Sequence, residues 1–554
     1  MNGDAPPKNF LFRLANRWRE RWMLVLCWLI FLVPFLISRL PYFLDYPLVI
    51  FNPDYAGYYM IADQIGKGLW PQFIIRTPGF PLFLMLVFAF CQRNMAVIVA
   101  QNLVSLVTSL FMIGTLEKIG RGKTKWLAPL AAVGLAAFTT SAVHLTGDVT
   151  LMSDSLGVNF LLLAFALLIR GIYSGSRWTL GWASLAMAAL VLIRPSGMFM
   201  VIIFLLVVVF LIIRRRHFSK RAMLFFAVPF SALLFLVSGY NLLTIRSFTV
   251  STFGEHALIS YTSMFLEQSP RYSAAVNDVI ASCRGLMSEE ERRLLNESWD
   301  LRQILRVFQK YYDNNRVFIA NRFIAAEDAD EYALYLKWRP LWKRLALDAI
   351  RAHPAIYLKF FLATLREFIT LNASDADFYA QLANNFLQLP SLENYFSGFA
   401  APQAGFNRRF NRKNYVQTLT PEFTRSLLKE YSRPLPLANF SVKRFHGQAR
   451  VRLRPTWRQR LHLGLQRLTT PLFRNLAWNA VFLLVWGWAL VRLVQSRFTH
   501  RAALLYFLMG LAVLINAVMA CMSGLPLLRY SYPLEFVFFL APGFLLLLIK
   551  PDPY

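Results

Sequence analysis

Long apolar blocks alternate with short polar stretches along most of the chain. Several blocks reach about 20 residues, the length at which an α-helix crosses the hydrocarbon core of a bilayer. The first follows a basic N-terminal segment and is too long for the apolar region of a signal peptide, so we interpret it as a signal anchor. The pattern predicts ten membrane-spanning helices, at about 22–41, 95–117, 126–146, 154–171, 178–194, 196–213, 222–244, 477–494, 502–521 and 530–549.

Positive residues orient these helices, because cytoplasmic loops are enriched in Lys and Arg. The N-terminal segment and four loops carry such clusters, and all fall on one side if every predicted helix spans. We therefore expect a multi-pass protein of the cytoplasmic (inner) membrane. The four loops contain Lys118, Arg121, Lys123 and Lys125; Arg170 and Arg177; Arg214, Arg215, Arg216, Lys220 and Arg221; and Arg492, Arg497 and Arg501.

The first long loop on the opposite side, 42–94, contains signals for two short helices. Asn52 and Pro53 are favoured at the N-cap and first position of a helix, and Gly66 is typical of a helix end. We expect a helix lying on the membrane surface here. A second short apolar helix is predicted over Gly79–Ala89.

The second long loop, 245–476, has apolar residues at helical spacing with charges between them. This pattern predicts a helical, basic extramembrane or interfacial region at 256–476. Within it, 353–371 is apolar but interrupted by charges, and we interpret it as interfacial. The stretch 405–476 has 16 Lys and Arg against 2 Asp and Glu, a density more typical of the cytoplasm. If 353–371 crossed the membrane, the stretch after it would be cytoplasmic, but the basic loop at 492–501 would move outside.

Composition excludes a soluble enzyme, a disordered chain and a disulfide scaffold. Of 554 residues, 56% are hydrophobic and 16% are charged, and the mean hydropathy is +0.43. In soluble proteins roughly 45–50% of residues are apolar and about 25% are charged. The net charge of +29 lies at the ends of apolar blocks and in one polar region, which favours anionic lipid or a phosphate-bearing substrate over nucleic acid. The four cysteines form neither a CxxC pair nor a Cys/His cluster.

Asp54 is the candidate catalytic residue. It follows the first predicted span at the start of the expected surface helix, where a carboxylate can accept a proton from an acceptor hydroxyl. An acid in the first turn of a helix is also stabilised by the helix dipole, so a structural role stays open. Tyr55 and Tyr58 come next and are candidates for substrate binding.

Four arginines are predicted at outer ends of spans, where topology does not explain them. Arginine suits phosphate because its planar donors bind two oxygens at once. The set therefore predicts a cationic site for a donor phosphate, although each residue alone is also explained by snorkelling to the membrane boundary. The four are Arg76, Arg194, Arg246 and Arg529.

Asp148 and Asp154 bracket a short outer turn between the third and fourth predicted spans. Both are candidates for substrate binding, and N-capping explains Asp154 equally well. No HExxH, Walker A, GxSxG or dinucleotide motif occurs, so neither a metal nor a cofactor is expected.

The order of these elements resembles a known family. The segments that carry the resemblance are NPDYAGYYMIADQIGKG, RTPGFPLFL, LMSDSLGVNFLLLAFAL, LIRPSG, IRSFTVSTFGEHAL and LLRYSYPLEFVFFL. In this order they resemble the GT-C superfamily of polyprenyl-phosphate-sugar-dependent glycosyltransferases, particularly the branch of protein O-mannosyltransferases and aminoarabinose:lipid A transferases. The likeness covers 1–255 and, more loosely, 477–549.

The resemblance implies an all-α polytopic fold with a seven-helix core and surface helices in the first outer loop. It also implies that Asp54 is the catalytic base and Arg76 a ligand of the donor phosphate. Many relatives have an Asp-Glu pair where this chain has Asp54-Tyr55. We thus expect three parts: a GT-C-like core at 1–255, the helical region at 256–476 and C-terminal transmembrane helices at 477–554.

The expected function is an inverting transfer of a sugar from a polyprenyl-phosphate donor to a glycan, lipid or protein acceptor on the periplasmic or exoplasmic face. Such a donor needs no metal to bind a diphosphate. The partners would be this donor, the acceptor and membrane lipids, without nucleic acid. A flippase or transporter for a lipid-linked sugar, or a lipid-linked polysaccharide polymerase, remains the alternative.

Overall fold

The computed structural model describes most of the helical parts of the chain. It covers 9–45, 50–51, 55–70, 76–121, 124–214, 218–285, 287–308, 310, 331–370, 440–445, 448–453, a few residues between 457 and 465, 476–523 and 535–549.

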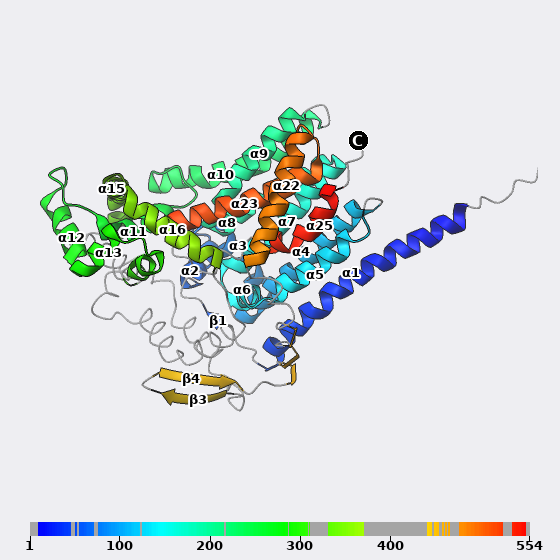
Figure 1. The fold of residues 1–554 in the computed structure, drawn as a ribbon, viewed down its shortest axis with the longest axis horizontal. Coiled ribbons are helices and arrows are strands. Elements are labelled where there is room, and N and C mark those ends of the chain that lie inside the picture. Colours follow the sequence, from blue (N-terminus) through cyan, green and yellow to red (C-terminus); the bar gives the residue numbers. More distant parts are fainter. Residues whose placement is uncertain are drawn as a thin grey trace, which may run out of the picture.

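Six of the described helices are long and apolar enough to cross a membrane, as expected of a helical multi-pass protein (Figure 1). The N-terminal part of α1 extends beyond the bundle that these helices form. The six segments are Trp22–Leu44 within α1 (Asn9–Asp45), α4 (Asn94–Gly120), α7 (Ser153–Ser174), Pro195–Ile213, which includes α9 (Phe199–Ile213), α10 (Lys220–Ile245) and Arg501–Met522 within α23 (Arg501–Ser523).

Four of the ten predicted spans correspond to shorter apolar helices, so the count of ten stays a prediction. These helices are α5 (Leu127–Thr140), α8 (Arg177–Ile193), Asn479–Gln495 within α22 (Leu476–Gln495) and α25 (Glu535–Ile549).

The span predicted over 126–146 is divided in the structure. Helix α5 ends at Thr140, and α6 (Ala142–Val149) begins after Ser141, whose hydroxyl accepts a hydrogen bond from the backbone N–H of His144. Ser141 thus caps a new helix, because its oxygen satisfies a donor that has no partner within the helix. The continuous apolar pattern concealed this break.

The bundle has one large apolar core, built from α1, α4, α5 and α7–α10 together with α22, α23 and α25. Helices α5 and α25 approach closely: a Cβ at Gly134 would lie only 2.6 Å from the carbonyl oxygen of Phe539. Phe138 packs against Phe536 and Phe539 at the same contact. The C-terminal helices therefore belong to the same core as the N-terminal ones.

A second helical unit lies at one end of the bundle, at the left in Figure 1, and has its own core around Tyr261, Trp342 and Phe360. Its helices include α11 (Phe253–Thr262), α12 (Ala274–Gly285), α13 (Glu289–Glu297), α15 (Glu331–Ala352) and α16 (Pro354–Thr370), and residues 301–308 are also helical. Helix α16 corresponds to the segment predicted to be interfacial, and it packs against both α15 and α23. Lys359 of α16 is buried and donates to the carbonyl oxygens of Leu295 and Asn296 at the end of α13.

The two short helices predicted in the first long loop are confirmed as α2 (Tyr55–Gly66) and α3 (Gly79–Phe90). Ahead of α2, strand β1 (Ile50–Phe51) pairs in parallel with β2 (Thr150–Leu151) between α6 and α7. A separate antiparallel pair, β3 (Phe440–Phe445) and β4 (Gln448–Leu453), lies within the basic region.

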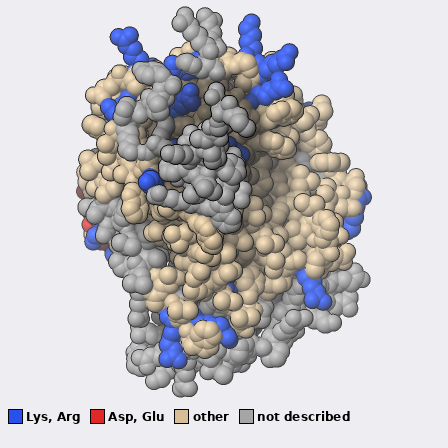
Figure 2. Space-filling model, turned by 90° about the vertical axis from the view of Figure 1, so that its right-hand side faces the viewer, with Lys and Arg blue, Asp and Glu red and all other residues tan. Residues whose placement is uncertain are grey.

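Positive charge gathers at the end of the bundle opposite the second helical unit. Figure 2 looks onto this end and shows Lys and Arg side chains around it, with little acidic surface. The described basic residues near the helix connections here are Lys118, Arg121, Lys125, Arg170, Arg177, Arg214, Lys220, Arg221, Arg492, Arg497 and Arg501. We call this the basic end of the bundle.

The charge distribution leads to a prediction about sidedness. In a background without Cys91 and Cys283, we expect an impermeant maleimide added to intact cells to label Glu290→Cys in α13 but not Lys125→Cys near the basic end. Both positions are exposed, so a difference in labelling between them would report the compartment and not the access. Labelling of Lys125→Cys alone would reverse the predicted orientation, and permeabilised cells provide the control.

Candidate functional site

Tyr58 of α2 connects the turn before α3 with the start of α7. Its ring lies under the guanidinium of Arg76, with 4.9 Å between Cζ and the ring centroid, and its hydroxyl is 3.0 Å from Oγ of Ser153. Tyr58 is buried and contacts Phe80 edge to face. Arg76 is thereby held close to the first turn of α7.

The turn that carries Arg76 is packed directly on the end of α8. A Cβ at Gly79, the first residue of α3, would lie 2.6 Å from the carbonyl oxygen of Leu192 and from the backbone nitrogen of Ile193. Only glycine allows the two backbones to approach this closely. The contact brings Arg76 near the end of α8, and Arg194 is the next residue after that helix.

Arg194 forms a buried ion pair with Asp154. Nη1 of Arg194 is 2.5 Å from Oδ1 of Asp154, and the two side chains are 8% and 4% exposed. Asp154 lies in the first turn of α7 and Arg194 caps the C-terminal end of α8, so each charge has the sign that the helix dipole favours. The Arg76–Arg194 cluster, as we call it, consists of Tyr58, Arg76, Ser153, Asp154 and Arg194.

Asp148 belongs to a different set of contacts. Its Oδ2 accepts a hydrogen bond from Nη2 of Arg39 at 2.5 Å, and its Oδ1 accepts one from Oγ of Ser155 at 2.5 Å. Nε2 of His144 is 3.3 Å from Oδ2. Burial alone would raise the pKa of the Asp148 carboxyl, but its interactions with His144, Arg39 and Ser155 lower this pKa to about 2. Asp148 is therefore an anion at neutral pH.

Arg39 uses its remaining donors within the same network. Its Nε donates to Oδ1 of Asn102 at 3.1 Å, and its Nη1 donates to the Thr139 carbonyl and to Oγ of Ser38, each at 2.7 Å. The guanidinium also lies over the ring of Phe35, 3.8 Å from its centroid. The Arg39–Asp148 network thus comprises Ser38, Arg39, Asn102, Thr139, His144, Asp148 and Ser155.

The structure therefore separates the two acids that the sequence suggested for one role. Asp154 lies in the Arg76–Arg194 cluster, whereas both carboxylate oxygens of Asp148 already interact with other side chains of the protein. Sequence reasoning missed Arg39, which lies within the first apolar block. Two features of the sequence indicated this pair: the ionisable Arg39 inside one predicted span, and the acid Asp148 just beyond the end of another.

The other predicted site residues are placed differently. Arg246 ends α10 with an exposed side chain and φ of 52°, a left-handed conformation that favours glycine. Asp54 and Arg529 lie outside the described residues, and Tyr55 is described only as the first residue of α2. Within the described part of the chain, no three His, Cys, Asp or Glu side chains gather as metal ligands.

No family model matches this chain, and no curated protein is significantly similar to it.

The geometry predicts that Asp148 is a structural residue. Asp148→Asn leaves the buried Arg39 without a counter-charge, a change that costs about 3–5 kcal/mol in comparable buried pairs. We expect a marked decrease in the thermal unfolding midpoint of the detergent-solubilised protein.

The matched control is Asp63→Asn, which breaks the partly exposed pair of Asp63 with Lys67; such a pair contributes only about 0.3–0.5 kcal/mol. If Asp148→Asn unfolded like the wild type and lost only substrate binding, Asp148 would be the substrate ligand that its position in the sequence suggested.

Proposed function

We propose that this protein is a membrane glycosyltransferase that transfers a sugar from a polyprenyl phosphate to an acceptor at the outer face of the membrane. The proposal combines the order of motifs in the sequence with the Arg76–Arg194 cluster. The inner-membrane location, a total of ten spans and an active site facing the periplasm or exterior are parts of the same proposal.

The proposed reaction is a single inverting displacement. Asp54 accepts the proton of the acceptor hydroxyl while that oxygen forms a bond to the anomeric carbon. The bond from this carbon to the phosphate oxygen breaks, and polyprenyl phosphate leaves with the electron pair. Arg76 and Arg194 stabilise the charge that grows on the departing phosphate, where preorganised donors are most effective.

The observation that carries the proposal is that one chain of contacts links Arg76, just before α3, with Arg194, just after α8. Tyr58, Ser153 and Asp154 form the contacts between them. Tyr55, the first residue of α2, directly follows Asp54 in the chain. The candidate base and the candidate phosphate ligands thus come from adjacent segments.

The distribution of charge along the helices gives less support to a flippase. A transporter of a charged headgroup needs charged side chains along its spans to offset the headgroup charge. In the six described spans, Arg39 is enclosed by the Arg39–Asp148 network, and the other charged residues lie within about one turn of a helix end. This pattern favours chemistry at one face over passage through the bundle.

Asp54→Asn tests the base. The amide keeps the shape of the side chain but does not accept the proton, so we expect transfer to fall by about 10²–10⁴-fold. Transfer of a labelled sugar from a synthetic polyprenyl-phosphate donor measures this with the purified protein. Asp63→Asn, a few residues further along in α2, should retain activity. A rate within about tenfold of the wild type for Asp54→Asn would refute the assignment.

Arg76→Ala and Arg194→Ala test the phosphate site. Each removes a charge-assisted hydrogen bond worth about 1.5–3 kcal/mol, which corresponds to roughly a 10–100-fold loss in affinity for a non-hydrolysable polyprenyl-phosphate analogue. If both residues hold one phosphate, the double variant should lose less than the sum of the single losses, because neighbouring contacts are coupled.

Because Arg194→Ala leaves Asp154 buried without its partner, its control is the pair Arg194→Ala with Asp154→Asn, which removes both charges. Arg177→Ala at the basic end is the control for a general loss of positive charge. Unchanged affinity in both single variants would mean that these arginines only mark the membrane boundary.

A further inference from the structure

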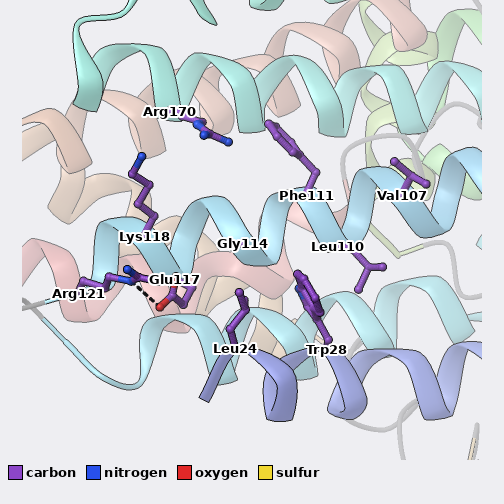
Figure 3. Close-up of a pocket in the computed structure, with 10 residues that line it drawn as sticks. All are labelled: Leu24, Trp28, Val107, Leu110, Phe111, Gly114, Glu117, Lys118, Arg121 and Arg170. Carbon is purple, nitrogen blue, oxygen red and sulfur yellow. Dashed lines mark hydrogen bonds and ion pairs between the residues drawn. The ribbon is translucent and has the colours of Figure 1, made fainter. Parts of the chain in front are cut away.

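A groove of about 590 Å³ lies along α4 at the basic end of the bundle, between α1 and α7 (Figure 3). Leu24 and Trp28 of α1 line one side, and Leu110 and Phe111 of α4 line its base. Arg170 of the groove lies near the C-terminal end of α7, whereas Ser153 and Asp154 of the Arg76–Arg194 cluster lie at its N-terminal end. The groove is therefore distinct from the Arg76–Arg194 cluster.

The middle of the groove is open because α4 has a glycine there. A Cβ at Gly114 would meet no other side chain or neighbouring backbone within 4 Å. From Gly114 toward Val107 the lining side chains of α4 and α1 are apolar, so this part of the open space suits a hydrocarbon chain rather than a polar ligand.

Basic side chains surround one end of the groove. Glu117 pairs with Arg121, with 2.7 Å between Oε1 and Nε. Lys118 and Arg170 have no carboxylate partner among the described residues, and Arg170 lies over the ring of Phe111. In Figure 3 both point toward the space between α4 and α7. Two cations thus face one position at the end of an apolar channel.

The length of the groove matches one leaflet of a bilayer. From Lys118 to Val107, at the other end of the lining, α4 rises about 16 Å at about 1.5 Å per residue. A bilayer core is about 30 Å thick, so one leaflet takes about half of this distance. The charged residues at the ends of α4 and α7 are thus placed to contact a lipid headgroup, and the apolar channel has the length of one acyl chain.

We propose that this groove binds one glycerophospholipid with an anionic headgroup, from the leaflet at the basic end of the bundle. Lys118 and Arg170 hold the headgroup phosphate, and one acyl chain runs over Gly114 toward Val107. The net positive charge of the rim selects an anionic headgroup over a zwitterionic one. This site does not depend on the proposed transfer reaction.

Native mass spectrometry tests the proposal. The full-length protein in a neutral detergent is titrated with phosphatidylglycerol, or with phosphatidylcholine that has the same acyl chains, and the bound lipid is measured. We expect the wild type to retain one phosphatidylglycerol in preference to phosphatidylcholine. Lys118→Ala and Arg170→Ala should each weaken phosphatidylglycerol binding by about tenfold or more. Gly114→Leu fills the channel and should abolish retention of this lipid.

Two matched controls make the result specific. Lys220→Ala removes an exposed charge at the same end of the bundle, and Gly239→Leu adds the same side chain at an open position of α10; both should bind phosphatidylglycerol like the wild type. Equal binding of the two lipids, or equal losses in Gly114→Leu and Gly239→Leu, would show annular lipid only and overturn the site.

A competition experiment distinguishes the proposed phospholipid from a polyprenyl lipid. Polyprenyl phosphate added in equal amount should not displace phosphatidylglycerol from the wild type. If it does so, and Gly114→Leu abolishes its binding, the groove holds a polyprenyl lipid and the proposal is wrong. Sugar transfer is measured separately and should remain in Gly114→Leu, so that failure of the lipid site and failure of the proposed reaction are distinguishable.

Discussion

The buried ion pair between Arg39 and Asp148 is the contact on which the half of the bundle around α6 depends. Moving a charge out of water costs several kcal/mol per ion, and the attraction offsets this only where the geometry is good and the other donors are used. Arg39 meets this condition, since it also reaches Asn102 and the carbonyl of Thr139. These partners belong to α4, α5 and α6, so one guanidinium fixes three helices relative to α1.

The same network determines where the candidate site lies. Gln101 of α4 donates to the carbonyl oxygens of Gly147 and Thr150, and Asn102 donates to that of Asp148. These bonds hold the backbone from the end of α6 into β2, and the chain then reaches Ser153 and Asp154 within a few residues. A displacement of the network would move the first turn of α7 and with it the partner of Arg194.

Local signals in the sequence predicted local structure well. Gly66 marked the end of α2, because helix ends depend on a few neighbouring residues; the predicted cap at Asn52 and Pro53 lies outside the described residues. Neither the break at Ser141 nor the different surroundings of Asp148 and Asp154 could be predicted. A capping serine in an apolar run has the same hydropathy as a serine inside a helix. The arginine partners that distinguish Asp148 from Asp154 lie far from them in the sequence.

The two ends of the bundle differ in whether their basic side chains are buried and paired with an acid. At the end that holds the Arg76–Arg194 cluster, Arg39 and Arg194 are buried and each has an acidic partner, so ions in solution screen these charges only weakly. At the basic end, Lys118 is exposed and has no carboxylate partner among the described residues, so its attraction for an anion decreases as salt concentration rises. The charges at the first of these ends are therefore held in place by their partners, whereas Lys118 at the basic end can reorient toward an anion.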